Sequence, residues 1–287
     1  MTEPPAPPPT DTRRFAAASL AAGDATGWFE ELYASARDGG AVVPWDVAAA
    51  SVRLREFPLP PGAGRRALVV GCGPGRDAEH LAALGYAVTA FDIAATAIEL
   101  ARSRHPESPV AYQVADLLDP PAAWTRAFDL VLESNNVQAL PAGIRTRAIA
   151  AVGEFVAPGG TLLVLAAAAT DVPPPADVPA PADVPRPAGV PAPVDVPLPT
   201  DIPALIDVLP ATDVPAVTDL PAVPDVAAAV GVPAGAGVLG EGPPWPLTRA
   251  EVDAFAGPGL RPISVEEITA PGTRLVRRWR AVFTRRP

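Results

Sequence analysis

Residues 67–100 read ALVVGCGPGRDAEHLAALGYAVTAFDIAATAIEL, and this stretch decides the fold. A short apolar run predicts a strand, a glycine-rich turn follows, and apolar residues at helical spacing lead into an alternating second strand that closes at Asp92. Gly71, Gly73 and Gly75 occupy alternate positions of the turn, where side chains would keep a ligand away from the backbone. The turn also opens a helix, whose first N–H groups are free to bind that ligand. An acid at the tip of the second strand can accept hydrogen bonds from both hydroxyls of a ribose, so the stretch predicts a nucleotide-like cofactor site.

The glycine spacing narrows the choice of cofactor class. The dinucleotide pattern G-x-G-x-x-G needs a glycine at position 76, where Arg76 stands, so NAD-dependent redox chemistry is disfavoured. The observed G-x-G-x-G followed by Asp92 resembles the first motif and ribose-binding acid of class I S-adenosylmethionine-dependent methyltransferases. Val69 stands where many of these enzymes carry an acid, and Asp77, within G-C-G-x-G-x-D, resembles a branch related to thiopurine, thiol and halide methyltransferases. The resemblance implies a Rossmann-like α/β fold, with a seven-stranded sheet covered by helices on both faces and S-adenosyl-L-methionine as cofactor.

Two later strands extend the resemblance. After a predicted strand at 110–114, the family's pattern implies that Asp116 binds the adenine amino group and that Leu117 packs on the ring, although Asp116 can equally cap a turn. A continuous apolar strand at 128–132 delivers the polar run 133–136 to the sheet edge where ligands bind in open α/β folds. The predicted cofactor contacts are Gly71, Cys72, Gly73, Gly75, Asp77, Asp92, Ile93, Asp116, Leu117 and Glu133, with Cys72 interpreted as a small residue tolerated between glycines.

The methyl acceptor is only weakly indicated. Glu133, Asn135 and Asn136 are candidate catalytic or substrate-facing residues, and Ser134 stands where thiopurine-type relatives carry a basic residue, so thiopurine specificity is unsupported. A thiol or halide acceptor needs no strong base, whereas a hydroxyl or amine would need Glu133 or a histidine to take its proton. The resemblance makes Trp45 a candidate lid over the cofactor or substrate. Trp245 is expected to pack in the core or to touch the substrate.

Other segments are expected to be structural. The Pro- and Ala-rich residues 1–24 are predicted to be disordered, and a helix capped near Asp24 should bury its aromatic residues in the core. Helix formers predict a helix over 47–50. Arg145 and Arg147, on a helix predicted at 144–156, are placed on a solvated face, and a final antiparallel hairpin should solvate the basic cluster Arg274, Arg277, Arg278 and Arg280.

A long repeat interrupts this pattern. Aspartates recur every six residues from 171 to 225, broken only at Gly189, and each is followed by an aliphatic residue. A left-handed β-helix has such a period, but the many prolines remove ladder donors and favour a disordered or polyproline II insert over 171–237. The logarithmic loop-closure rule gives a cost of about 2 kcal/mol, so the insert can split one methyltransferase domain, 25–168 and 238–285. The alternative is a degenerate methyltransferase-fold scaffold whose insert recruits polyproline-binding partners.

Composition supports a small-molecule enzyme. The chain has 287 residues and a net charge of −10, of which −8 falls within 171–226, so the remainder is nearly neutral. The sequence has no stripe of basic residues that could follow a nucleic-acid backbone, so a nucleic-acid substrate is disfavoured. It also has no apolar run with the length of a signal-peptide core or a membrane span, which predicts a cytoplasmic protein. Two histidines and one cysteine predict no metal cluster and no internal disulfide.

Overall fold

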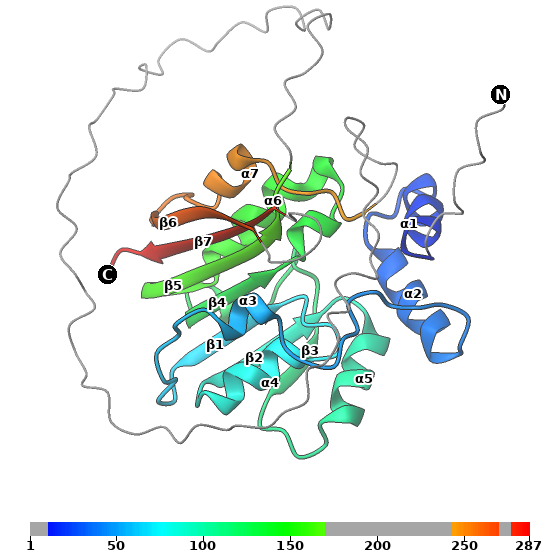
Figure 1. The fold of residues 1–287 in the computed structure, drawn as a ribbon, viewed down its shortest axis with the longest axis horizontal. Coiled ribbons are helices and arrows are strands. Elements are labelled where there is room, and N and C mark those ends of the chain that lie inside the picture. The colour runs from blue at the N-terminus through cyan, green and yellow to red at the C-terminus, as the bar shows by residue number, and fades with distance from the viewer. Residues whose placement is uncertain (1–10, 170–242, 270–276) are drawn as a thin grey trace, which may run out of the picture. The chain divides into compact units, whose positions relative to one another are not determined.

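The computed structural model describes residues 11–169, 243–269 and 277–287, and all of them belong to one compact unit. Its centre is a seven-stranded sheet in the order β3-β2-β1-β4-β5-β7-β6, which confirms the predicted fold class (Figure 1). The strands are β1 (Arg66–Val70), β2 (Ala87–Asp92), β3 (Ala111–Val114), β4 (Phe128–Ser134), β5 (Val156–Ala167), β6 (Leu260–Thr269) and β7 (Arg277–Arg285). Neighbouring strands from β3 to β5 are parallel, whereas β7 is antiparallel to both β5 and β6.

Helices cover both faces of the sheet. They are α1 (Asp11–Ala21), α2 (Gly27–Arg37), α3 (Val52–Arg55), α4 (Arg76–Ala83), α5 (Ala95–Arg104), α6 (Ala142–Glu154) and α7 (Arg249–Asp253), with short 3-10 turns η1 (Ala122–Trp124) and η2 (Val137–Ala139). Side chains alternate between the faces of a strand. Leu68 and Val70 of β1 therefore join the core with α6 and α7, while Ala67 and Val69 pack with α3, α4 and α5.

The strands on either side of the predicted insert share this sheet. Ala168, just after β5, forms a parallel bridge with Leu247, which lies just before α7. The Leu247 amide donates to the Ala167 carbonyl and the Ala169 amide donates to the Leu247 carbonyl, both at 2.9 Å. A capping box formed by Thr248 and Glu251 begins α7. The repeat itself lies outside the described residues, as do its predicted polyproline conformation and partners.

Two predictions of local structure are wrong. The disorder expected over 1–24 does not extend to 11–21, which form α1, because its alanine-rich sequence favours a helix and Ala16 is fully buried beside α2. The helix expected over 47–50 is absent, and helical structure begins only at Val52. This segment instead bonds to α4, since Arg76 Nε donates to the Val47 carbonyl at 3.2 Å and the Ser51 amide donates to Asp77 Oδ1 at 2.8 Å.

Candidate active site

The glycine turn between β1 and α4 has a backbone and a space that only glycine suits. Gly71, Gly73 and Gly75 all have positive φ, at 57°, 50° and 90°. A Cβ on Gly71 would lie 1.5 Å from Asn136 Nδ2, and one on Gly75 would lie 2.2 Å from the Tyr112 hydroxyl oxygen. The turn therefore needs glycine for its own folded conformation, in which the amides of Cys72 and Gly75 donate to the carbonyls of Phe91 and Cys72.

Asp92, at the end of β2, holds this turn. Its Oδ2 accepts a hydrogen bond from the Gly73 amide and its Oδ1 accepts one from the Ala94 amide, both at 2.9 Å. Burial raises the pKa of this carboxyl, while the hydrogen bonds from backbone amides oppose that rise. A carboxylate offers about four acceptor positions. The Ile93 amide also bonds to this carboxylate, so Asp92 braces the turn and keeps about one acceptor position for a ribose hydroxyl, which fits a nucleoside-containing cofactor.

The loop after β3 lies against the same strand end. The Ala115 amide donates to the Asp92 carbonyl at 3.1 Å, which brings the following residues beside the ribose position. Leu117 is buried in the core that also contains Val70, while Asp116 is half-buried and its Oδ1 accepts the Leu118 amide at 2.8 Å. Asp116 therefore shapes a turn in this structure and keeps its second carboxylate oxygen for a ligand.

Glu133, the second-last residue of β4 and the first residue of the polar run 133–136, is completely buried next to the glycine turn. It pairs in register with Val70, the residue that precedes Gly71. Its Oε1 accepts the amides of Asn136 and Val137, each at 2.8 Å, but its Oε2 is buried without a hydrogen-bond partner. Burial raises the pKa of Glu133 to about 7, since the two amides only partly offset the loss of water. A buried carboxyl with a free oxygen is suited to a cationic group of a bound ligand.

Asp77, in the first helical turn of α4, connects the glycine turn to Ser51 and Ser134. Besides the Ser51 amide, it accepts a hydrogen bond from the Ser134 side chain, and burial raises its pKa overall. The sequence predicted Asp77 as a cofactor contact. In the structure its bonds fix the segment before α3 and the end of β4 to the glycine turn.

A cover formed by α2 and residues 43–46 lies over Gly73. The Tyr33 hydroxyl oxygen would be 2.8 Å from a Cβ on Gly73, and this hydroxyl accepts a hydrogen bond from Trp45 Nε1 at 2.7 Å. Glu30 of α2 accepts the Thr96 amide at the start of α5 at 3.0 Å. Trp45 thus lies near the glycine turn, bonded to Tyr33, which the sequence placed among core aromatics, and its role as a lid stays a prediction.

A protein-family model described as "Methyltransferase domain" matches residues 67–160, from β1 into β5. These residues form a class I S-adenosylmethionine-dependent methyltransferase domain. The match contains the glycine turn, Asp92, Asp116 and Glu133, whereas the cover, with Tyr33 and Trp45, precedes it.

Curated relatives match about a third of the chain. The ubiquinone biosynthesis O-methyltransferase of Xanthomonas oryzae pv. oryzae is 38% identical over 104 residues, which cover 36% of this chain and 43% of that protein. Its counterpart in Xanthomonas campestris pv. campestris is 36% identical over 103 residues, covering 35% and 42%. The chain thus spans less than half the length of the curated relatives that it matches.

Two solved structures share the methyltransferase fold. A Burkholderia thailandensis 1,6-didemethyltoxoflavin-N1-methyltransferase, with bound 1,6-didemethyltoxoflavin and S-adenosylhomocysteine, superposes with a TM-score of 0.53 at 14% identity, covering 99% of this chain and 94% of that one. A protein described under the conversion of a disulfide bond into a thioacetal group during echinomycin biosynthesis gives 0.52 at 24% identity, covering 90% and 93%. At these identities the likeness concerns the fold.

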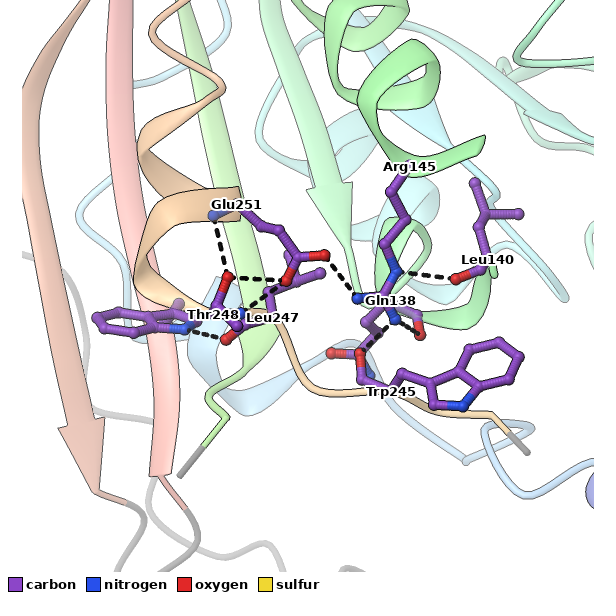
Figure 2. A network of polar contacts seen from close by, with 8 residues as sticks. Gln138, Leu140, Arg145, Trp245, Leu247, Thr248 and Glu251 are labelled. Carbon is purple, nitrogen blue, oxygen red and sulfur yellow. Dashed lines mark hydrogen bonds and ion pairs between the residues drawn. The ribbon is translucent and has the colours of Figure 1, made fainter. Parts of the chain in front are cut away.

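Arg145 joins α6 of the methyltransferase domain to the segment that precedes α7, and the prediction of a solvated position is wrong. The residue is only 6% exposed, and its guanidinium donates to Glu251 Oε1 at 2.7 Å and to the carbonyls of Leu140, Trp245 and Gln138 at 2.8, 2.8 and 3.3 Å (Figure 2). The Trp245 ring also lies near this guanidinium, with 5.9 Å between the ring centroid and Arg145 Cζ (Figure 2). Arg147, two residues later on α6, is exposed as predicted.

Arg145 therefore fixes Trp245 next to η2. The Trp245 amide donates to the Gln138 carbonyl at 2.8 Å, and Gln138 Oε1 accepts the Ala167 amide at the end of β5. The half-buried Trp245 lies outside the hydrophobic core clusters, contrary to the expected core packing. Its bond to Gln138 places it near η2, which directly follows the Glu133–Asn136 run in the sequence.

A separate cleft of about 590 Å³ runs between α2 and α5. The cleft shares five residues with the cover, Tyr33, Ala36, Arg37, Val43 and Asp46. Asp46 and Arg104 form an ion pair in its wall, with Nη2 and Oδ2 at 2.7 Å. None of the glycine-turn residues lines it.

Within the described ranges, no helix has the length and apolar character to cross a membrane, and no three His, Cys, Asp or Glu side chains gather as they would around a metal ion.

Proposed function

We propose that the protein transfers the methyl group of S-adenosyl-L-methionine to a small-molecule acceptor. The observation that supports this most directly is the double role of Asp92, which braces the Gly73 amide and keeps acceptor capacity for a ribose. In this proposal Asp116 and Leu117 hold the adenine, Ile93 lines the nucleoside, and the backbone of Gly71, Cys72 and Gly75 contacts the cofactor.

Glu133 is the proposed counter-charge for the α-amino group of the cofactor. Its Oε2 is buried without a partner, Glu133 pairs with the residue that precedes the glycine turn, and burial raises its pKa to about 7. A bound ammonium would favour the ionised form, because an opposite charge lowers the pKa of a buried carboxyl. Glu133 would then supply the acidic group that is missing at Val69.

The protein's share of the chemistry is positioning and exclusion of water. The bound cofactor supplies an already electrophilic methyl group on a sulfonium. The cover of Tyr33 and Trp45 closes over Gly73, and alignment of acceptor and methyl group can provide most of the rate enhancement. A thiol or halide acceptor, which Asp77 favours through its likeness to that branch, requires no strong base. A hydroxyl acceptor, as in the O-methyltransferases matched above, or an amine requires one, and with Glu133 assigned to the cofactor a histidine is the remaining candidate.

Calorimetric titration with S-adenosylhomocysteine tests the proposal. The wild-type chain should bind it, and Asp92→Ala should lower affinity by about tenfold or more, because a buried carboxylate with several hydrogen bonds contributes on the order of 1.5–3 kcal/mol. Asp129→Ala is the matched control, since Asp129 Oδ2 also accepts one backbone amide, that of Arg66 at 2.8 Å, but at the start of β4, on the opposite sheet edge. Absence of binding to the wild type, or equal effects of both variants, would overturn the proposal. Labelled S-adenosylmethionine then identifies the acceptor among thiols, halides, phenols and amines.

A further inference from the structure

Arg278, the second residue of β7, lies at the same sheet edge as the glycine turn. It pairs with Ala167 at the end of β5 and with Ile268 of β6. Because β7 is antiparallel to β5, the start of β7 adjoins the carboxyl end of the parallel strands. Trp279 points into the core shared with α6 and α7, so alternation along the strand places Arg278 on the opposite face, the face of α3 and α4.

The Arg278 guanidinium has little to bind within the described residues. Its Nη1 donates to Asn135 Oδ1 at 3.2 Å, and its Nε is buried without an acceptor. Burial and the nearby positive charge of Arg53, on α3, together lower the pKa of Arg278 to about 10. The expectation that the basic cluster of β7 is solvated is therefore wrong for Arg278, which is half-buried beside a like charge.

Its neighbours show that this arrangement is specific. Arg277 and Arg280 of the same strand pair with Glu267 and Glu266 of β6. Among the described residues, by contrast, neither Arg278 nor Arg53 forms an ion pair with a carboxylate. Two neighbouring cations without an anion repel each other, and their burial is unfavourable. A negatively charged ligand would relieve both effects.

Asn135 connects this pair to the proposed reaction centre. It has a positive φ of 60°, and its amide donates to the Leu165 carbonyl of β5 at 2.8 Å. The next residue, Asn136, carries the side chain that lies over Gly71. One face of the Asn135–Asn136 pair thus contacts the glycine turn and the other contacts Arg278.

We propose that Arg278 and Arg53, with Asn135, form a subsite for an anionic oxygen group, a carboxylate or a phosphate, on the methyl acceptor. Guanidinium groups present planar sets of donors that match the oxygens of both groups. This inference rests on the proposed methyl transfer. It narrows the acceptor to a small molecule that carries a negative charge beside the atom that is methylated.

The test separates the subsite from the cofactor site. The full chain, saturated with S-adenosylhomocysteine, is titrated calorimetrically with benzoate, phenyl phosphate and the neutral isostere benzamide. Benzoate or phenyl phosphate should bind more tightly than benzamide, and Arg278→Gln and Arg53→Gln should each lower that affinity by about tenfold or more. Which of the two anions binds more tightly distinguishes carboxylate from phosphate recognition.

The controls make failure informative. Arg147→Gln removes an exposed arginine of α6 and should leave every titration unchanged. Arg53→Gln alters the short helix α3 rather than the sheet, so it tests the subsite even if Arg278→Gln does not fold. The inference is overturned if the anions bind no better than benzamide, or if neither arginine variant weakens them. Failure of the wild type to bind S-adenosylhomocysteine would overturn the proposed function instead.

Discussion

The Asp92 carboxylate accepts the Gly73 amide at 2.9 Å, so the tip of β2 and the middle of the glycine turn are held by one hydrogen bond. The turn adopts a positive φ on either side of Pro74, and Asp92 fixes the part that faces the proposed ribose position. Conformation of the turn and affinity for the cofactor are therefore coupled through this pair.

Gly73→Ala should lower S-adenosylhomocysteine affinity by about tenfold, because a positive φ costs a non-glycine residue about 1–2 kcal/mol. The added Cβ would also lie 2.8 Å from the Tyr33 hydroxyl oxygen. Gly143→Ala is the control: this glycine lies in α6 with open space around it, so alanine should leave affinity unchanged and add up to about 1 kcal/mol of stability. Calorimetry and urea unfolding measure the two effects.

Glu133 makes stability depend on pH. Its pKa of about 7 in the fold exceeds its ordinary value of 4.5, so the folded state binds the proton more tightly than the unfolded state. The free energy of unfolding should thus fall as pH rises from 4.5 through 7, by on the order of 3 kcal/mol. Glu133→Gln keeps an acceptor for both amides and should lack this fall. Urea unfolding of both proteins at pH 5 and pH 8 gives the comparison, and equal pH dependence would contradict the assignment.

Cofactor binding should also displace the Glu133 proton. If Glu133 faces the α-amino group, S-adenosylhomocysteine binding at pH 6 releases up to one proton in the wild type and none from this site in Glu133→Gln. Titrations in two buffers with different ionisation enthalpies measure the number. Identical proton release in the two proteins would mean that Glu133 is not the counter-charge.

Arg145→Ala should destabilise the fold by about 3–5 kcal/mol, because it leaves Glu251 and buried carbonyls without their donor. Arg147→Ala, two residues later on the exposed face of α6, should change stability by no more than about 0.5 kcal/mol. Thermal and urea unfolding measure both. A similar effect of the two substitutions would show that the network in Figure 2 contributes little to stability.

Trp45→Phe and Tyr33→Phe should each speed dissociation of S-adenosylhomocysteine several-fold, since each removes the 2.7 Å hydrogen bond of the cover. The double variant should add little to either, because they act on one interaction worth about 1 kcal/mol. Tyr86→Phe is the control: the Tyr86 hydroxyl donates to the Pro60 carbonyl at 3.0 Å and lies away from the glycine turn. Stopped-flow displacement measures the rates, and additive effects would argue against a shared cover.

The central stretch could be predicted from the sequence because its evidence is local. Glycine spacing and an acid at a strand tip are set by residues within one βαβ unit, and the structure places Gly71, Gly73, Gly75 and Asp92 accordingly. The last hairpin was implied by the family resemblance, and the structure has it as β6 and β7. The assignment to the thiol and halide branch rests on Asp77 alone and stays a prediction.

What the sequence did not reveal depends on distant partners. Arg145 and Arg147 look alike on a helix, and only Glu251, beyond the repeat, decides that Arg145 is buried. Arg278 stands among other arginines, and only the positions of the β6 glutamates leave it without a carboxylate. Tyr33 combines a core position with a hydroxyl at the glycine turn, for which aromatic spacing on a helix gives no signal.

The backbone bonds that join Ala167 and Ala169 to Leu247 make the chain divisible. Both sides of a break placed anywhere in 170–242 remain attached to the sheet by these bonds, and the two pieces carry complementary open edges, β5 on one and β7 on the other. Separate polypeptides for the two halves should therefore recombine into one enzyme. The repeat's position thus marks a natural split site, at which methyl transfer can be made conditional on bringing two fragments together.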